Sequence, residues 1–368
     1  MSIIKVENMA YKTETNIQLL QGSIKYYFMN ERYMDNEDLL DRDFDLVKYI
    51  NIPKLHFDKM DLEIRNFRFK VHSPNVFKFF RKVYGISNET YMKSVCHKCI
   101  HLPKKNTKNY MWKTKDRHMM IVELSKREKT TLRCLLKSYF LNQAQHPRSF
   151  LPKLYGCYTL KYNNQKIRIL VCNSVSPILE EEYMQFKFNG IERRIVPTDE
   201  AYIYEFKDND FIRIIKHHIK LELEILNAIR DRIYHNTIQS ESAIHFKFSR
   251  LKKHSIIVKK SLSLQTQDTL IPRNNYYASA VQIQQKHYAK NFIIPEGAIY
   301  GLIENRPIYI YAGIVDILQQ CSNVKNFRNN IKKLFCMKKI NSTNESNNYS
   351  KRFMEFLFSK LFTAIPEP

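Results

Sequence analysis

The sequence predicts an α+β fold in which helices pack on antiparallel sheets. The prediction starts from residues 114–174, where a β-prone run, His118–Leu124, precedes a segment with helical periodicity. Two more β-prone runs follow, Lys153–Tyr162 and Ile167–Cys172, and the pair Asn163-Asn164 between them suits a short hairpin turn. A helix beside such a hairpin makes one lobe, so a chain of 368 residues has room for a second.

The helix of this segment has clear start and stop signals. Ser125 with Glu128 three residues later is typical of a capping box, and Pro147 and Pro152 end the helix. Apolar residues recur at three- and four-residue steps between these signals, which predicts one face packed on the strands. These residues are Leu132, Leu135, Leu136, Tyr139 and Phe140.

Upstream, residues 67–95 predict a buried pair of helices. Ser73 suits the N-cap, Pro74 the first helical position and Gly85 the end of the first helix, and Asn88 starts the second. Residues 1–65 mix helix-capable and β-capable runs with short acidic clusters. We expect solvated loop and edge elements there, without chemistry, because short charge runs are usually at the surface.

Downstream, the longest helical pattern covers Phe206–Tyr234, and its apolar stripe is typical of core. Residues 236–290 carry little pattern. The β-prone runs 298–303 and 307–314 then predict a hairpin, and Tyr349–Phe362 predicts a closing amphipathic helix.

The net charge of +24 indicates an anionic partner: nucleic acid, an anionic membrane surface or a phosphorylated ligand. No apolar run of about 18 residues exists, so no transmembrane helix is expected, and the N-terminus lacks the features of a signal peptide. Seven scattered cysteines are typical of reduced thiols rather than a disulfide framework. These observations favour a cytoplasmic or nuclear protein.

Cys96, Cys99 and the neighbouring His97 and His101 suggest a zinc site, because thiolates and imidazoles suit a tetrahedral ion. A structural site usually needs a second ligand pair, and the next cysteine, Cys134, lies inside the predicted helix. Ordinary strand or loop residues are therefore the favoured interpretation.

Two other stretches have the composition of a phosphate or metal site. Lys104–Asn109 is a lysine-rich turn before an aromatic β-prone segment, and nucleotide-binding proteins often have a glycine-rich turn in such a place. Asp316 follows the apolar strand 307–314 and suits either a magnesium ligand or a helix cap. Beyond it, residues 325–339 are strongly basic with interleaved apolar residues.

Several motifs, in order, resemble the phosphatidylinositol phosphate kinases, lipid kinases with a two-lobed fold of antiparallel sheets and packed helices. The similarity covers residues 67–215 and 292–362. It is carried by FLPKLYG from Phe150 (family L-P-x-F-Y-G), RILVCN from Arg168 (R-F-V-V-M-N), KDNDF from Lys207 (L-K-D-x-D-F), GIVDIL from Gly313 (G-I-I-D-I-L) and YSKRF from Tyr349 (Y-x-x-R-F). The resemblance implies an N-terminal extension over residues 1–66, an N-lobe over 67–173 and a C-lobe over 174–368. It also implies a poorly matched insertion over about 250–290 and an activation-loop-like segment over 319–348.

The resemblance also implies ATP and Mg²⁺ as cofactors. The family's strand lysine, in F-I-I-K, falls on Val122, and its glycine-rich turn falls on Lys104–Asn109. Lys105 and Lys108 are then the candidates to reach phosphates from the rebuilt turn, and the hinge residues Cys172 and Asn173 lie beside the nucleotide.

The implied catalytic residues lie in the second lobe. Asp316 matches the magnesium-binding aspartate, and Lys187 is the one residue kept from the D-L-K-G-S element. The M-D-Y-S-L-L aspartate falls near residues 243–248, where His245 is the candidate base.

Because at least three catalytic groups are altered, we predict a catalytically degenerate member that binds phosphoinositides at the cytosolic face of membranes. Basic side chains of the 325–339 segment would bind the anionic lipid: Lys332, Lys333, Lys338 and Lys339. One alternative is an active phosphatidylinositol-4-phosphate 5-kinase with relocated groups. Another is a basic nucleic-acid-associated protein. A homodimer or a partner lipid kinase is also an expectation, as is a nuclear location.

Overall fold

The computed structural model describes residues 2–30, 39–53, 67–102, 110–146, 149–175, 183–188, 206–207, 217–238, 245–251, 299–304, 306–315, 318 and 353–366. The chain forms two compact units. Unit 1 comprises residues 1–137 and 152–179, and unit 2 comprises residues 138–151 and 180–368. Each unit contains one sheet. The lobe boundaries proposed from the sequence, after residues 66 and 173, stay predictions.

Unit 1 is built on a seven-stranded antiparallel sheet with the order β1-β2-β6-β7-β5-β4-β3. Its strands are β1 (Val47–Ile50), β2 (Arg68–His72), β3 (Cys99–His101), β4 (Met111–Thr114), β5 (Met119–Glu123), β6 (Leu154–Tyr162) and β7 (Gln165–Asn173). Strand β6, an interior strand of this sheet, is buried along nearly its whole length, as expected where both faces of a sheet are covered.

The strand–helix–hairpin prediction for residues 114–174 is confirmed. Helix α5 (Lys126–Gln145) starts at the predicted capping box, where the Ser125 N–H donates to the Glu128 carboxylate and the Glu128 N–H donates to the Ser125 hydroxyl. Strands β6 and β7 meet at Asn163 and Asn164, whose φ angles of 43° and 62° are the left-handed values of a tight turn.

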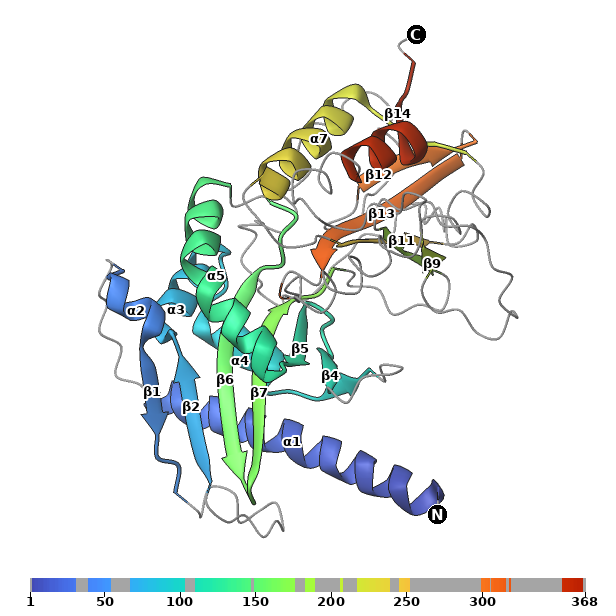
Figure 1. Cartoon of the computed structure of the whole chain (residues 1–368). Coiled ribbons are helices and arrows are strands. Elements are labelled where there is room, and N and C mark those ends of the chain that lie inside the picture. Colours follow the sequence, from blue (N-terminus) through green and yellow to red (C-terminus); the bar gives the residue numbers. More distant parts are fainter. Residues whose placement is uncertain are drawn as a thin grey trace, which may run out of the picture. The chain divides into compact units, whose positions relative to one another are not determined.

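Alternate residues of β6 face different helices. Tyr162 donates to Asn16 of helix α1 (Ser2–Asn30), and the Tyr158 hydroxyl lies 3.0 Å from that of Tyr91 in α4 (Asn88–Val95). Thr159 lies on the opposite face, 3.5 Å from the Lys129 ammonium of α5. The sheet is therefore covered by α1 and α4 on one face and by α5 on the other (Figure 1).

The expectation of solvated loop over residues 1–65 is wrong for α1. This helix buries Ile17, Leu19, Leu20 and Ile24 against unit 1, and the Gln21 side chain donates to the Val95 carbonyl. The prediction relied on short acidic runs, which are usually exposed. The burial of α1 depends instead on contacts with residues distant in the sequence, which a local pattern does not show. Helix α2 (Asp41–Asp45) follows, and β1 is the edge strand that the sequence suggested.

The helical pair of residues 74–95 is confirmed, with one difference. Helix α3 (Pro74–Val83) begins at Pro74 as predicted, but the Ser73 hydroxyl donates to the Phe44 carbonyl and makes no cap hydrogen bond. The φ of 45° at Ser73 explains the difference, since an N-cap residue normally has β-region angles. Gly85 has a φ of 67° just past the helix, the conformation that favours glycine.

Unit 2 contains a mixed sheet with the order β14-β10-β12-β13-β11-β8-β9. Its strands are β8 (Tyr183–Phe188), β9 (Phe206–Lys207), β10 (Ile219–Leu221), β11 (His245–Leu251), β12 (Ile299–Ile303), β13 (Arg306–Val315) and β14 (Phe362–Ala364). The predicted hairpin is confirmed as β12 and β13. The pairs β8·β9 and β10·β14 are parallel and the others are antiparallel.

The single helix predicted over Phe206–Tyr234 is wrong. Residues 206–207 and 219–221 are strands, and helix α7 covers Leu223–Ile238. Ile219 and Leu221 are buried at alternate positions of β10, which lies between β12 and β14. The apolar residues here therefore follow the two-residue period of a strand, although Ile219 also fitted the helical stripe. The closing helix likewise ends at Leu361, in a π-turn before β14.

Among the helices that the structure describes, none combines the length and the apolar content needed to cross a membrane.

Candidate functional site

Three residues that the sequence assigned to a nucleotide lie on neighbouring strands of unit 1. Val122 of β5 pairs with Leu170 of β7, and Met120 of β5 pairs with Cys172. Val122 and Cys172 are therefore diagonal neighbours on one sheet face, because residues two apart in a strand share a face. Asn173 ends the same strand, β7. The structure brings these positions together, and their role in binding stays a prediction.

The ladder row that contains Val122 is apolar at its centre. Its cross-strand partners are Met111 of β4 and Leu170 of β7, and Leu170 in turn pairs with Cys157 of β6. No member of this row offers a cation. The Cys157 thiol is neutral as well, because burial raises its pKa to about 12.

The end of β7 is fixed by hydrogen bonds to the segment that enters β6. The Asn173 side-chain oxygen accepts from the Lys153 backbone N–H at 2.7 Å, and the Asn173 N–H donates to the Lys153 carbonyl at 2.9 Å. Ser174 donates from its N–H to the His118 carbonyl at 2.8 Å. The side chain of Asn173 thus ties the end of β7 to the segment that enters β6. Burial raises the pKa of the neighbouring Cys172 thiol to about 12.

Lys113 is a residue of this face that the sequence did not suggest. It lies on β4 opposite Met120, so its register places it on the same face as Val122, one row along the sheet. Its side chain is buried, with 6% exposed. An ammonium group at such depth is costly unless it is paired. The sequence MWKT does not show how β4 pairs with β5. Lys113 is related to Val122 only through that pairing register, so the sequence could not identify it.

In unit 2, strand pairing brings two predicted catalytic positions near the end of β13. Lys187 of β8 pairs with Lys247 of β11, and His245 of β11 pairs with Val315, the last residue of β13. Asp316 follows Val315 directly in the chain. The backbone register therefore puts Lys187 and His245 on adjacent strands, with His245 opposite Val315.

The remaining predicted site residues lie outside the described part of the chain, so their roles stay predictions. They are Lys105 and Lys108 of the lysine-rich turn, Asp316, and the basic residues Lys332, Lys333, Lys338 and Lys339.

Cys96 and Cys99 have ordinary protein contacts. The Cys96 thiol donates to the Gln21 carbonyl at 3.5 Å, and the Cys99 thiol lies 3.5 Å from the His97 carbonyl. Burial raises the pKa of each thiol to about 12. Within the described residues, no three His, Cys, Asp or Glu side chains are grouped as metal ligands would be.

A family model described as phosphatidylinositol-4-phosphate 5-kinase matches residues 101–360, more than half of the chain. The chain belongs to this family. The resemblance stated from the sequence motifs is thereby confirmed, and so is the α+β fold class.

Similar proteins include type-1 members of the family from several animals. Phosphatidylinositol 4-phosphate 5-kinase type-1 alpha of Homo sapiens is 27% identical over 348 residues, which cover 89% of this chain and 62% of that protein. The type-1 beta protein of Mus musculus is 27% identical over 367 residues, covering 94% of this chain and 68% of that protein. The chain thus spans less than two thirds of the length of the human relative.

Proposed function

We propose that this chain is a phosphoinositide-binding member of the family that docks on anionic membranes and transfers phosphate inefficiently. Family membership supports the lipid class, since the names of its relatives specify phosphatidylinositol 4-phosphate. The net charge of +24 supports docking on an anionic surface.

The observation that carries the catalytic part of the proposal is Val122. The resemblance puts the phosphate-binding lysine at this position of β5, where the chain has a side chain without charge or hydrogen-bond donor. Its row neighbours Met111 and Leu170 are apolar as well. Phosphoryl transfer depends almost wholly on positioned charges, and loss of one such group typically costs about 10²–10³ in rate.

Membrane docking is assigned to basic residues beyond Asp316. Lys332, Lys333, Lys338 and Lys339 belong to one strongly basic segment. Each lysine near an anionic surface contributes about 1 kcal/mol of attraction, so four such residues suffice for reversible binding.

Vesicle flotation tests the docking proposal. The full chain is mixed with vesicles that contain phosphatidylinositol 4-phosphate, or phosphatidylserine at matched surface charge. We expect the chain to float preferentially with the phosphoinositide, and a variant with the four lysines changed to glutamine to lose most of this binding. Equal flotation with both lipids would contradict phosphoinositide recognition and leave only non-specific attraction.

A second candidate function, an active kinase with a relocated lysine, is supported by Lys113. Its ammonium belongs to the same sheet face as Val122 and lies one strand away, on β4. A cation on this neighbouring strand would neutralise the charge of a phosphate bound beside Val122, where β5 itself has no cation.

A thermal-shift titration with ATP and Mg²⁺ separates the two candidates at the level of binding. If Lys113 replaces the strand lysine, ATP raises the unfolding midpoint of the native chain, and Lys113→Met removes that increase. Lys115→Met, an exposed lysine two residues away, is the control. A shift that is absent in the native chain, or present in both variants, excludes the role of Lys113.

A further inference from the structure

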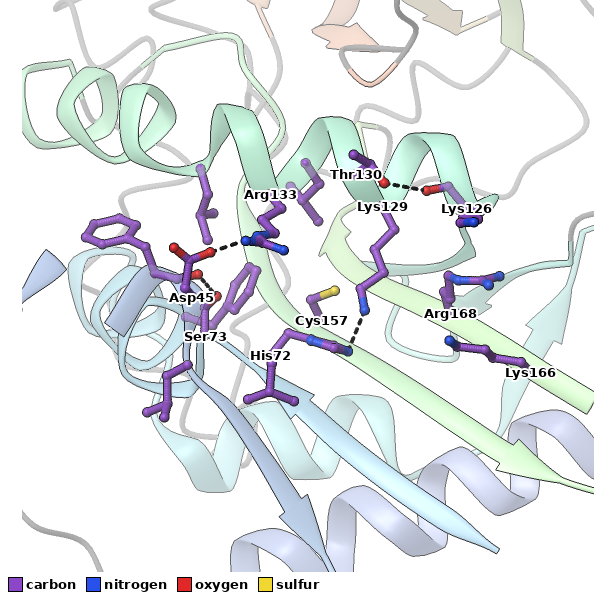
Figure 2. Close-up of a pocket in the computed structure, with 16 residues that line it drawn as sticks. Asp45, His72, Ser73, Lys126, Lys129, Thr130, Arg133, Cys157, Lys166 and Arg168 are labelled. Atoms are coloured by element: carbon purple, nitrogen blue, oxygen red, sulfur yellow. Dashed lines mark hydrogen bonds and ion pairs between the residues drawn. The ribbon is translucent and has the colours of Figure 1, made fainter. Parts of the chain in front are cut away.

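A cavity of about 280 Å³ lies in unit 1 between the first turns of α5, strands β2, β6 and β7, and the segment after α2. Figure 2 shows Lys129 reaching from α5 toward His72 of β2, with Arg168 and Lys166 on strand β7 beyond β6. The cationic side chains that line it are Lys126, Lys129, Arg133, Lys166 and Arg168.

The charges of this cavity are not balanced by its described lining. Asp45 is the one carboxylate among the described lining residues, and it is held by Arg133 in an ion pair of 2.7 Å. The other four cations therefore have no acidic partner within the described lining of the cavity. Such a concentration of like charge is unfavourable unless an anion neutralises it.

Two polar residues that line the cavity, His72 and Lys129, are joined by a hydrogen bond. The His72 Nε2 lies 2.8 Å from the Lys129 ammonium and 2.8 Å from the Thr159 hydroxyl. Because an ammonium can only donate, the imidazole accepts from Lys129 and is neutral. A charged lysine is thus held in a fixed position by neutral partners, and its charge remains to be neutralised from the cavity.

Sheet register places one more cation, Lys70, near this hydrogen-bonded group. Arg168 pairs with Thr159, and Thr159 pairs with Lys70 on its other side, so the three share one row of the sheet. Burial and the nearby Arg168, Lys70, Lys126 and Lys161 lower the pKa of Lys166. Burial lowers the pKa of Lys129 as well, with contributions from Lys166, Arg168 and Lys70. These shifts agree with a site built from mutually repelling cations.

The cavity lies on the same face of the sheet as the nucleotide-facing residues and begins beside them. Arg168 is two residues from Leu170, the cross-strand partner of Val122, and Cys157 of the cavity lining also pairs with Leu170. The distance from the hinge is larger. On β7, Arg168 precedes Cys172 by four residues and Lys166 precedes it by six, or roughly 13–20 Å at about 3.3 Å per residue. Val122, Cys172, Asn173 and Lys113 do not line it.

We propose that this cavity is a second binding site for a compact polyanion carrying two or more phosphate groups, either a soluble phosphate ester or the headgroup of a phosphoinositide. Arg168 and Lys166 hold one phosphate from β7, and Lys129 and Lys126 hold another from α5. Arg133 remains with Asp45 at the rim. The site does not depend on catalysis and stands whether or not the chain transfers phosphate.

Isothermal titration calorimetry on the full chain tests this site, with inositol 1,4,5-trisphosphate and inorganic pyrophosphate as soluble probes. The cavity variant is the double substitution Lys166→Gln and Arg168→Gln. We expect it to weaken binding of at least one probe by about tenfold or more, because charge-assisted hydrogen bonds to phosphate are lost. Loss of two repelling cations is not expected to unfold the chain, and circular dichroism checks this.

The control is a double variant with the same change in net charge, Lys115→Gln and Arg127→Gln, two exposed residues outside the cavity. It should retain binding within about twofold. Flotation on vesicles containing phosphatidylinositol 4,5-bisphosphate provides the lipid arm. If the cavity variant loses binding to the soluble probes in calorimetry, the ligand is a soluble phosphate ester. If it loses only flotation with the vesicles, the ligand is a lipid headgroup. Absence of binding in both arms, or equal weakening by the control, overturns the proposal.

Discussion

His72 is a neutral histidine at physiological pH because of where β2 places it. Burial, together with the charges of Lys129, Lys70 and Lys166, lowers its pKa to about 3. The imidazole accepts a hydrogen bond from Lys129 in this state. Protonation would remove that acceptor and add a fourth positive charge to the three that surround it.

This shift predicts an acid-sensitive stability. Between about pH 6.5 and pH 3 the unfolded chain binds a proton at His72 that the folded chain does not, so stability falls as the pH is lowered through this range. From pH 7 to pH 5 the expected loss is about 1–2 kcal/mol. Urea unfolding of the native chain and of His72→Gln at both pH values measures it. The variant should show a smaller loss, and an equal loss in both would refute the shifted pKa.

Gly156 is required by close packing at a bulge between β6 and β7. A Cβ there would lie 2.6 Å from the Tyr158 hydroxyl and 2.8 Å from the Tyr91 hydroxyl. Both tyrosines are buried and hydrogen-bonded to each other, so neither moves without cost.

Gly156→Ala should therefore destabilise unit 1 by about 1–3 kcal/mol through overpacking. Denaturant unfolding measures the change, with the exposed Lys161→Ala on the same strand expected to cost less than about 0.5 kcal/mol. A neutral Gly156→Ala would show that the tyrosine pair can shift.

At the residue scale, the sequence predicted which strands carry the candidate site residues better than it predicted which side chains lie next to them. Val122, Cys172 and Asn173 were placed by short motifs, and the structure puts them on adjacent strands. Lys113 was missed, and so was the cluster around His72, because both depend on cross-strand register. Register is set by pairings between residues far apart in the chain, which local pattern does not encode.

At the scale of elements, those with local signals were predicted and those held by distant contacts were not. The capping box and the Asn163-Asn164 turn specify α5 and the β6–β7 hairpin within a few residues. Helix α1 has no acidic residue in its first turn and no basic residue in its last. Its position depends on contacts such as Phe28 with Tyr91, whose ring centroids are 5.6 Å apart.

Helix α1 should accordingly contribute to the stability of unit 1. Phe28 is buried against Tyr91 and lies under the Arg81 guanidinium at 5.2 Å, so Phe28→Ala should cost about 3–5 kcal/mol. Thermal or urea unfolding of unit 1 measures this loss. The adjacent Met29 is 69% exposed, and Met29→Ala is the matched control, with an expected cost below about 0.5 kcal/mol. Similar values for the two variants would mean that α1 does not pack in solution as described.

At the scale of the whole molecule, the chain combines an α+β family fold with a strongly basic composition. The chain carries 60 Lys and Arg against 36 Asp and Glu, with only 7 Gly. We therefore predict that side-chain charge takes the place of a glycine-backbone phosphate site. Cations gather beside α5 in unit 1, whereas the predicted strand-lysine position is apolar. These features favour binding of phosphorylated ligands over rapid transfer of phosphate.

Transfer of radiolabelled phosphate from ATP to phosphatidylinositol 4-phosphate in vesicles tests this account most directly. The human type-1 alpha relative, assayed in parallel, is the reference. We predict that the chain floats with these vesicles yet transfers phosphate at least about 100-fold more slowly, as expected from loss of a positioned charge. A rate within about tenfold of the reference, abolished by Asp316→Asn, would contradict it.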